Sequence, residues 1–412
     1  MTENEAGVPV FDLSFGDWEF NQQPYEILEE VRAAGPVVYN SRAGRYMVTS
    51  YRNCARVLGN VKEFNSQSAL EDTVRFFGGI TMMFLDTPRH DQMRGVWSED
   101  FQRASLQERR DLVESVVQER VDPFVERVLS GETVDAIPNM TRGIPTLVIA
   151  HMLGIETDMF EQFSAWSDAM GASTEASFDP SPRGERLARE GMEATRDLNE
   201  YIVGQIAERR GRTARSEPGT DDLVGKMVNS EFGRTNMEES ELVASNTQLV
   251  FAGNETTASL MGHTLVALAT HPEQREALIA DRSLIPQAIE EVHRWSTVTQ
   301  AGGRRACSDH SEIEGIRIPE GSEISPLQGA GNRDPERWEN PAKFDITRTP
   351  IAHLGFGFGM HSCLGLNLAR LEMEVWLNRL LDRLPNYELA GTVDYGTNFI
   401  LRGPIVVPIA SS

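Results

Sequence analysis

The segment 356–377 (FGFGMHSCLGLNLARLEMEVWL) carries the clearest chemical signal in the chain, because a single cysteine, Cys363, stands in a glycine-rich loop before a predicted amphipathic helix. The flanking glycines are Gly357, Gly359 and Gly365. Glycine allows a backbone to lie close against a flat ligand, and amide N–H groups at a helix N-terminus favour a negative charge. These features stabilise a thiolate. A buried structural cysteine is the alternative, but it explains neither the glycines nor the neighbouring His361.

A second chemical candidate lies inside a long predicted helix. No proline occurs between Pro218 and Pro272, and Thr235 and Glu238 have the spacing of a capping box. A helix of about 30 residues or more is therefore predicted, well above the usual length, and such a helix usually runs through the middle of a protein. Its centre, 252–259 (AGNETTAS), is small and polar. Either a helix crossing requires small residues there, or the helix is locally opened beside a ligand.

The remaining pattern predicts a mainly α protein with a minor β portion. Apolar residues three and four apart predict helices over most of 88–297 and over 361–384. Short runs punctuated by Gly and Pro predict strands near 36–50, 307–325 and 386–410. Since no shift in composition marks a linker, residues 1–412 are predicted to form a single domain.

Composition restricts the partners and the compartment. The chain has 39 Lys and Arg against 62 Asp and Glu, a net charge of −23, which repels nucleic acid and anionic lipid. Three scattered cysteines are too few for a disulfide framework, which favours a reducing compartment. No stretch approaches the roughly 18 consecutive apolar residues of a membrane span. We therefore expect a cytoplasmic protein that binds neither nucleic acid nor membranes.

The cysteine loop FGFGMHSCLG resembles the haem-binding loop of the cytochromes P-450, whose cysteine thiolate is the axial iron ligand. Three further segments resemble family motifs in the same order: 86–94 (DTPRHDQMR), 252–257 (AGNETT) and 290–294 (EEVHR). The resemblance implies the family's fold, a triangular helix-rich prism with a long central helix and small β-sheets. It also implies one haem b per chain, with Cys363 as the metal ligand.

The resemblance gives the matching positions roles around the haem. The Cys363 thiolate would donate charge to the iron and favour O–O cleavage, and Phe356 would pack beside the sulfur. Cations would hold the propionates, and whether Arg304 or Arg305 does so stays open. The implied cofactor-binding residues are His90, Arg94, Ala252, Gly253, Arg304, Phe356, His361, Cys363 and Gly365.

Glu255 and Thr256 are the implied catalytic pair. An acid that reaches solvent and a hydroxyl that orders water together relay the protons that dioxygen cleavage needs. Ala252 and Gly253 would leave room for dioxygen, whereas Thr257 is expected to face away. The intact acid–alcohol pair favours a monooxygenase supplied with electrons over a peroxide-using peroxygenase or a non-catalytic haem sensor, which remain the alternatives.

The family's layout also implies a scaffold and a pocket. The scaffold is a buried ionic network of Glu291, Arg294 and Arg348. The substrate pocket would draw on Gln248, Phe251, Ala252, Val298 and Phe399. It would also use the loop 68–84, which matches no assignable pattern and contains Arg75, a candidate partner for a substrate carboxylate.

The implied reaction inserts one oxygen atom from O2 into a small apolar or aromatic substrate. Several segments resemble members that hydroxylate or O-demethylate para-substituted benzoates; a terpenoid or other secondary metabolite is the alternative. Electrons would come from a ferredoxin and its NAD(P)H-dependent reductase, and the protein is expected to be a monomer. The predicted ferredoxin-docking cations are Arg103, Arg109, Arg110, Arg337, Lys343 and Arg370.

Overall fold

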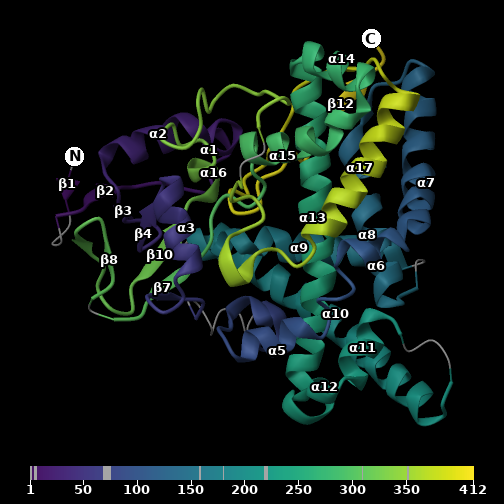
Figure 1. The fold of residues 1–412 in the computed structure, drawn as a ribbon, viewed down its shortest axis with the longest axis horizontal. Coiled ribbons are helices and arrows are strands. Elements are labelled where there is room, and N and C mark those ends of the chain that lie inside the picture. The colour runs from purple at the N-terminus through teal and green to yellow at the C-terminus, as the bar shows by residue number, and fades with distance from the viewer. Residues whose placement is uncertain are drawn as a thin grey trace.

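The structure is a computed structural model that describes residues 2–3, 7–67, 76–156, 159–179, 181–217, 221–308, 310–349 and 352–412. Helices dominate it and the strands are short, which confirms the predicted fold class. Figure 1 shows the long helices gathered on one side of the molecule, while most strands lie with the N-terminal segment on the other side.

The helices divide into long ones that build the body of the molecule and short ones that connect them. The longer helices are α2 (Pro24–Ala34), α7 (Arg110–Leu129), α8 (Gly143–Leu153), α9 (Phe160–Ser173), α10 (Pro182–Ala214), α13 (Glu239–Thr270), α15 (Ile285–Trp295) and α17 (Leu366–Arg383). The shorter helices are α1 (Trp18–Gln22), α3 (Tyr51–Gly59), α5 (Arg89–Gly95), α6 (Arg103–Gln107), α11 (Leu223–Asn229), α12 (Glu231–Asn236), α14 (Pro272–Ala280) and α16 (Gln328–Gly331). Further turns of 3-10 or π helix are η1 (Met82–Phe84), η2 (Ile137–Thr141), η4 (Thr174–Phe178), η5 (Arg282–Leu284) and η6 (Gly359–His361).

The long helix predicted from the proline-free stretch is α13, with 32 residues, and in Figure 1 it stands beside α17, which separates it from α7. The predicted capping box was misplaced by one turn. The Thr235 hydroxyl bonds the Glu231 carbonyl inside α12, and Met237 is extended, which ends that helix. The capping box of α13 is formed by Glu238 and Glu241 instead, with the Glu238 N–H 2.9 Å from Glu241 Oε2.

The polar centre of α13 is a continuous α-helix, so it is not locally opened. The helix-crossing explanation holds for Gly253, because a Cβ there would lie 2.8 Å from Ile149 Cγ1 on α8. Glycine in a helix interior costs about 1 kcal/mol relative to alanine, and here that cost is offset by the close packing of the two helices.

The largest sheet has the strand order β1-β2-β3-β4-β10-β7-β5. Its strands are β1 (Thr2–Glu3), β2 (Pro9–Phe11), β3 (Val38–Asn40), β4 (Arg45–Val48), β5 (Phe64–Asn65), β7 (Arg304–Ala306) and β10 (Glu323–Pro326). A second sheet joins β11 (Glu388–Leu389), β12 (Pro408–Ala410) and β6 (Val134–Asp135), and β8 (Glu312–Ile313) pairs with β9 (Ile316–Arg317). Because side chains alternate along a strand, β7 turns Arg304 inward and Arg305 outward.

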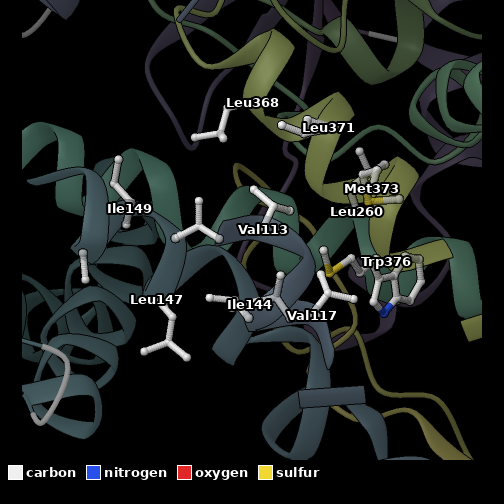
Figure 2. Close-up of a cluster of buried hydrophobic side chains, with 14 of the residues drawn as sticks. Val113, Val117, Ile144, Leu147, Ile149, Leu260, Leu368, Leu371, Met373 and Trp376 are labelled. Carbon is white, nitrogen blue, oxygen red and sulfur yellow. The ribbon is translucent and has the colours of Figure 1, made fainter. Parts of the chain in front are cut away.

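The main hydrophobic core lies between α7, α8, α13 and α17 (Figure 2). Trp376 and Met373 of α17 are fully buried there, together with Val117 of α7 and Ile144 of α8. Each such side chain contributes about 1.5–3 kcal/mol of burial free energy. This packing fixes the N-terminal end of α17, where the Cys363 loop ends, relative to the centre of α13.

Candidate active site

The Cys363 loop is closed by its own backbone. The Cys363 N–H donates to the Phe356 carbonyl over 2.8 Å, and the Gly357 N–H donates to the Leu354 carbonyl over 2.9 Å. Gly357 and Gly359 both have φ of +74°, a left-handed conformation that favours glycine. Gly365 directly precedes α17, and a Cβ on it would lie 3.9 Å from Cys363 Sγ. The glycines thus let the chain turn tightly around the sulfur at the start of the helix.

The electrostatics of Cys363 combine opposing influences. Burial raises the pKa of the thiol above its ordinary value, whereas a hydrogen bond from the Gly365 backbone and the charges of Arg94 and Arg370 lower it. The side chain nevertheless keeps an accessible surface. A coordinated metal ion deprotonates a thiol outright, so the N–H and the two cations would then stabilise the thiolate. This arrangement fits a metal ligand.

Four groups that can carry positive charge meet beside this loop: His90 and Arg94 on α5, Arg304 on β7, and His361. The rings of His90 and His361 lie 4.4 Å apart. Burial, together with Arg304 and the other cations, lowers the pKa of His361 to about 3. Burial lowers the pKa of Arg304 to about 10. At neutral pH the positive charge here comes from the two arginines, next to the carboxylates of Asp86 and Asp91, and a bound anion would compensate the buried guanidinium of Arg304.

The structure distinguishes Arg304 from Arg305. The Nε atoms of both arginines have no hydrogen-bond partner within the described residues, but Arg304 is buried and its charge acts on His361. Arg305 instead pairs with Glu323 over 3.2 Å on the outer side of the sheet. Arg304 is therefore the arginine that faces the anion site, and an unpartnered buried guanidinium nitrogen fits a haem propionate.

Ala252 and Thr256 occupy one face of α13. The Thr256 hydroxyl donates to the Ala252 carbonyl over 3.1 Å, and Ala252 is exposed although it lies in the middle of the central helix. Gly253 faces α8 and Thr257 is buried, so neither shares this face. Within 252–257, Ala252 and Thr256 are thus the pair that offers an accessible surface and a hydroxyl.

Glu255 points in a third direction, toward α9. Its carboxylate lies against Gly171, and Oε2 is buried without a hydrogen-bond partner in the part of the chain that the structure describes. Burial and the negative charge of Asp168 raise the pKa of Glu255 to about 8, against the opposing influence of Arg142. Glu255 therefore holds its proton at neutral pH, as a proton donor must.

Arg142, Asp168 and Gly171 were not predicted from the sequence. Arg142 NH1 pairs with Asp168 Oδ2 over 2.9 Å beside the Glu255 carboxyl group. The sequence signal for these residues is weak: Gly171 interrupts the helical pattern of α9, and Gly143 and Pro145 follow Arg142, but neither feature indicates that the residues meet.

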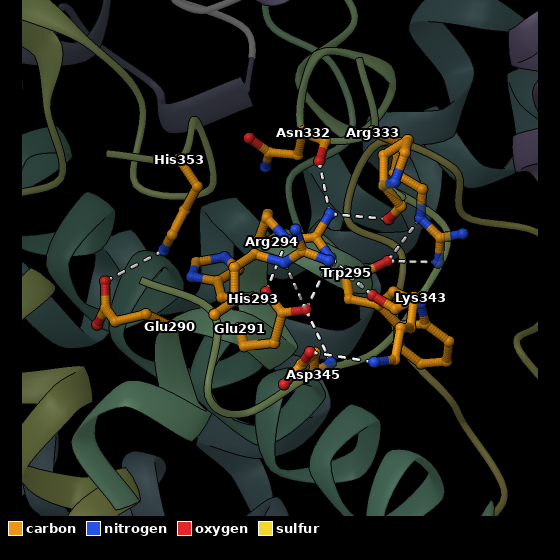
Figure 3. A network of polar contacts seen from close by, with 12 residues as sticks. Glu290, Glu291, His293, Arg294, Trp295, Asn332, Arg333, Lys343, Asp345 and His353 are labelled. Carbon is orange, nitrogen blue, oxygen red and sulfur yellow. Dashed lines mark hydrogen bonds and ion pairs between the residues drawn. The ribbon is translucent and has the colours of Figure 1, made fainter. Parts of the chain in front are cut away.

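The implied scaffold residues form one largely buried network, and Figure 3 shows Glu291 and Arg294 at its centre. Arg294 contacts Glu291 through Nε and NH2, at 2.7 and 2.8 Å, and Arg348 Nε reaches Glu291 Oε1 at 3.2 Å. Arg294 NH1 also donates to the carbonyls of Asn332 and Pro341, both at 2.9 Å. The network ties α15 to the segment that follows α16.

The implied pocket residues are only partly brought together. Phe251 packs with Phe76 and Phe77, at ring distances of 5.2 and 6.0 Å. Gln248 is buried one turn earlier on α13, and Val298 is buried in the main core. Arg75 and the rest of 68–75 lie outside the described residues.

Phe399 does not join this group. Its ring stacks on Phe15 at 4.5 Å and packs against Phe20 at 5.1 Å, in a separate core with α1 and α2. The side chain is 1% exposed, so aromatic packing with the N-terminal segment holds it away from a substrate.

Comparison with known proteins decides the family. The family model described as Cytochrome P450 matches residues 13–385. This chain is a cytochrome P450. It is 35% identical over 310 residues to the vitamin D3 dihydroxylase of Streptomyces griseolus, covering 75% of this chain and 71% of that protein. It is 30% identical over 412 residues to the 6-deoxyerythronolide B hydroxylase of Saccharopolyspora erythraea, covering 95% and 96%.

Solved structures agree with this assignment. A crystal structure of the Bacillus megaterium protein CYP109E1 in complex with testosterone superimposes with a TM-score of 0.86, at 27% identity, over 96% of this chain and 100% of that one. The cytochrome P450 assignment confirms a monooxygenase whose family uses a haem-iron cofactor. Among the described residues, no helix combines the length and apolar character needed to cross a membrane.

The residues of this cytochrome P450 fit the haem in two respects. Cys363 is an accessible thiol with stabilising partners, and Arg304 presents an unpartnered nitrogen in an anion site. When bound, haem supplies the iron at which dioxygen is activated. Cys363 would hold the iron, while His90, Arg94, Arg304 and His361 would hold the propionates.

Proposed function

We propose that this cytochrome P450 hydroxylates a bulky secondary metabolite, with Glu255 and Thr256 as its proton relay. We further propose that the chain is a single domain and a monomer that binds one haem b through Cys363. The observation that carries the relay is the geometry of Glu255 and Thr256. They are adjacent on α13, with one protonated acid buried toward α9 and one hydroxyl on the accessible face. Glu255 can release its proton toward Thr256. It can then be reprotonated through Asp168, the acid that pairs with Arg142 beside it.

The substrate class rests on the relatives. Their names describe hydroxylation of vitamin D3 and of 6-deoxyerythronolide B, and the superimposed structure holds testosterone. All three compounds are large alicyclic or macrocyclic molecules. These comparisons support a secondary metabolite, the alternative substrate class of the sequence analysis, over a para-substituted benzoate.

A spin-state titration tests the substrate class. Substrate that displaces water from the haem iron shifts the Soret band of the ferric protein to shorter wavelength. We expect this shift with macrolactones or steroids at micromolar concentration and none with 4-methoxybenzoate. A shift with 4-methoxybenzoate alone would contradict the proposal and restore the benzoate hypothesis.

The electron donor is proposed to be a ferredoxin that docks on the predicted cations. Most of these cations have intramolecular partners: Arg110 pairs with Glu114 and Glu374, Lys343 pairs with Asp345, and Arg370 pairs with Glu290. Arg109 lies 3.8 Å from Asp100. Arg103 and Arg337 make no ion pair within the described residues, so their charges are the most available to an acidic partner.

Charge reversal tests the docking surface. We expect the double variant R103E/R337E to slow ferredoxin-dependent reduction at least tenfold at low salt without changing substrate binding. The control is Arg196→Glu, which reverses an exposed arginine on α10. Equal reduction rates in the double variant and the control would contradict docking at this surface.

A further inference from the structure

The ring of Phe356, at the start of the cysteine loop, is held on several sides. The His293 ring meets it edge-on, with centroids 4.5 Å apart and an angle of 87°. The His353 ring lies 5.7 Å away, and Arg370 Cζ lies 5.1 Å from the Phe356 centroid. Gly355 makes room for this packing, because a Cβ there would lie 2.7 Å from His293 Nε2.

Glu290 joins two of these groups. Its carboxylate accepts from Arg370 Nε over 2.7 Å and from Arg370 NH2 over 2.8 Å, a bidentate pair. It also lies 3.2 Å from His353 Nε2 (Figure 3). The Gly355 N–H donates to His353 Nδ1 over 3.0 Å, so that nitrogen is unprotonated and Nε2 donates to Glu290. One carboxylate therefore connects α15, α17 and the segment that leads into the cysteine loop.

Arg370 acts electrostatically on the cysteine. It lies in the second turn of α17 with its Cζ 5.1 Å from the centroid of the Phe356 ring, and the Phe356 carbonyl accepts the Cys363 N–H over 2.8 Å. Glu290 compensates the positive charge of Arg370 through their bidentate ion pair. The balance between Arg370 and Glu290 thus sets part of the electrostatic potential that a Cys363 thiolate experiences.

We propose that Glu290 is a positioning residue that tunes the electron donation of the Cys363 thiolate, by orienting Arg370 and compensating its charge. The proposal rests on the proposed function, since it requires haem bound through Cys363. A cation near the thiolate favours the more negative, reduced state of the iron centre, and the Glu290 carboxylate opposes this effect. Glu290 therefore keeps the reduction potential lower than Arg370 alone would.

A purely structural role is the competing explanation, in which the pair only fastens α15 to α17. The Arg370 and Glu290 side chains are 32% and 23% exposed, and partly exposed ion pairs add little to stability. A structural role predicts changes in haem retention or melting temperature without a directional change in potential. The two explanations therefore differ in whether the reduction potential shifts in opposite directions when Glu290 and Arg370 are replaced.

The test is the ferric/ferrous reduction potential of the purified holoprotein, measured by spectroelectrochemistry without substrate. We expect Glu290→Gln to shift the potential to more positive values and Arg370→Gln to shift it to more negative values. The double variant should lie between them. Glu374→Gln is the matched control, because it removes the carboxylate partner of Arg110 from the same helix, and it should leave the potential unchanged.

Two shifts in the same direction, or shifts no larger than that of Glu374→Gln, would overturn the proposal. If Glu290→Gln does not retain haem, Arg370→Gln alone decides, since a shift to more positive values or no shift refutes the tuning role. The wild-type ferrous–CO spectrum distinguishes a failure of the tuning role from a failure of the proposed function. A strongly red-shifted Soret band establishes thiolate ligation, whereas its absence would overturn the proposed function and this proposal with it.

Discussion

Gly171→Ala tests the proton relay from a residue that touches neither haem nor dioxygen. In the structure, a Cβ on Gly171 would lie 2.9 Å from Glu255 Cδ and closer still to Oε2. Carbon atoms in contact prefer separations of about 3.5–4.0 Å, so the carboxyl group must move by roughly 1 Å or more. Because it is the far end of a flexible side chain, it can rotate away without displacing the backbone of α13.

The expected effects on folding and on catalysis have opposite signs. Alanine stabilises a helix interior by about 1 kcal/mol relative to glycine, so the free energy of unfolding should not fall. Displacing Glu255 from its buried position should return its pKa from about 8 toward the ordinary value of 4.5. The carboxyl group then no longer carries a proton at neutral pH. Loss of a general acid typically slows its step by about 10²–10⁴-fold.

The assay compares NADH consumed, product formed and hydrogen peroxide released. We expect Gly171→Ala to bind substrate and haem normally but to form less product per NADH and to release more peroxide. Gly204→Ala on α10 is the control, because no atom lies within 4 Å of the Cβ it would add. Wild-type coupling in Gly171→Ala, together with normal stability, would refute the role of Glu255 in this relay.

Four further predictions follow from the same geometry. Glu291→Ala leaves the buried Arg294 and the partly buried Arg348 without their carboxylate partner and should cost about 3–5 kcal/mol, seen as lost haem and a lower melting temperature. Thr256→Ala should raise peroxide release several-fold at unchanged haem content; unchanged coupling would contradict its role. Arg304→Gln should weaken haem retention about tenfold or more, whereas Arg305→Gln should change it less than twofold, and equal losses would contradict the inward position of Arg304. Because the pKa of Glu255 is raised to about 8, its contribution to stability is complete below pH 4.5 and is lost as the pH rises toward 8. Glu255→Gln should therefore flatten the decline of unfolding free energy between pH 5 and 9 in denaturant titrations.

The local sequence predicted those parts of the site that depend on contiguous residues. The turn geometry of the Cys363 loop follows from its glycines, and the i, i+3 spacing of Glu291 and Arg294 leads directly to their ion pair. The length of α13 followed from the absence of proline, whereas its capping box was misplaced because Thr235 bonds within the preceding helix.

Contacts between distant segments were beyond such reasoning. Phe399 lies near the C-terminus in a segment that the family layout assigns to the pocket, yet its ring is held by Phe15 and Phe20. The Arg142–Asp168 pair joins residues 26 positions apart, and nothing in either local pattern indicates that they meet beside Glu255. Tertiary packing, rather than local propensity, decides such positions.

The small, polar residues at the centre of α13 serve different purposes, because each residue faces a different neighbour. Successive residues of an α-helix point about 100° apart, so adjacent positions meet different neighbours. Gly253 lies against Ile149 of α8, and Asn254 forms a hydrogen bond with Thr146, which is also on α8. Glu255 lies against Gly171 of α9. The remaining face, with Ala252 and Thr256, carries the one exposed residue of the segment 252–257, Ala252. The helix-crossing alternative of the sequence analysis therefore holds on the face of Gly253, whereas the alternative of a locally opened helix is wrong. The regular helix holds the Glu255 acid and the Thr256 hydroxyl in fixed relative positions.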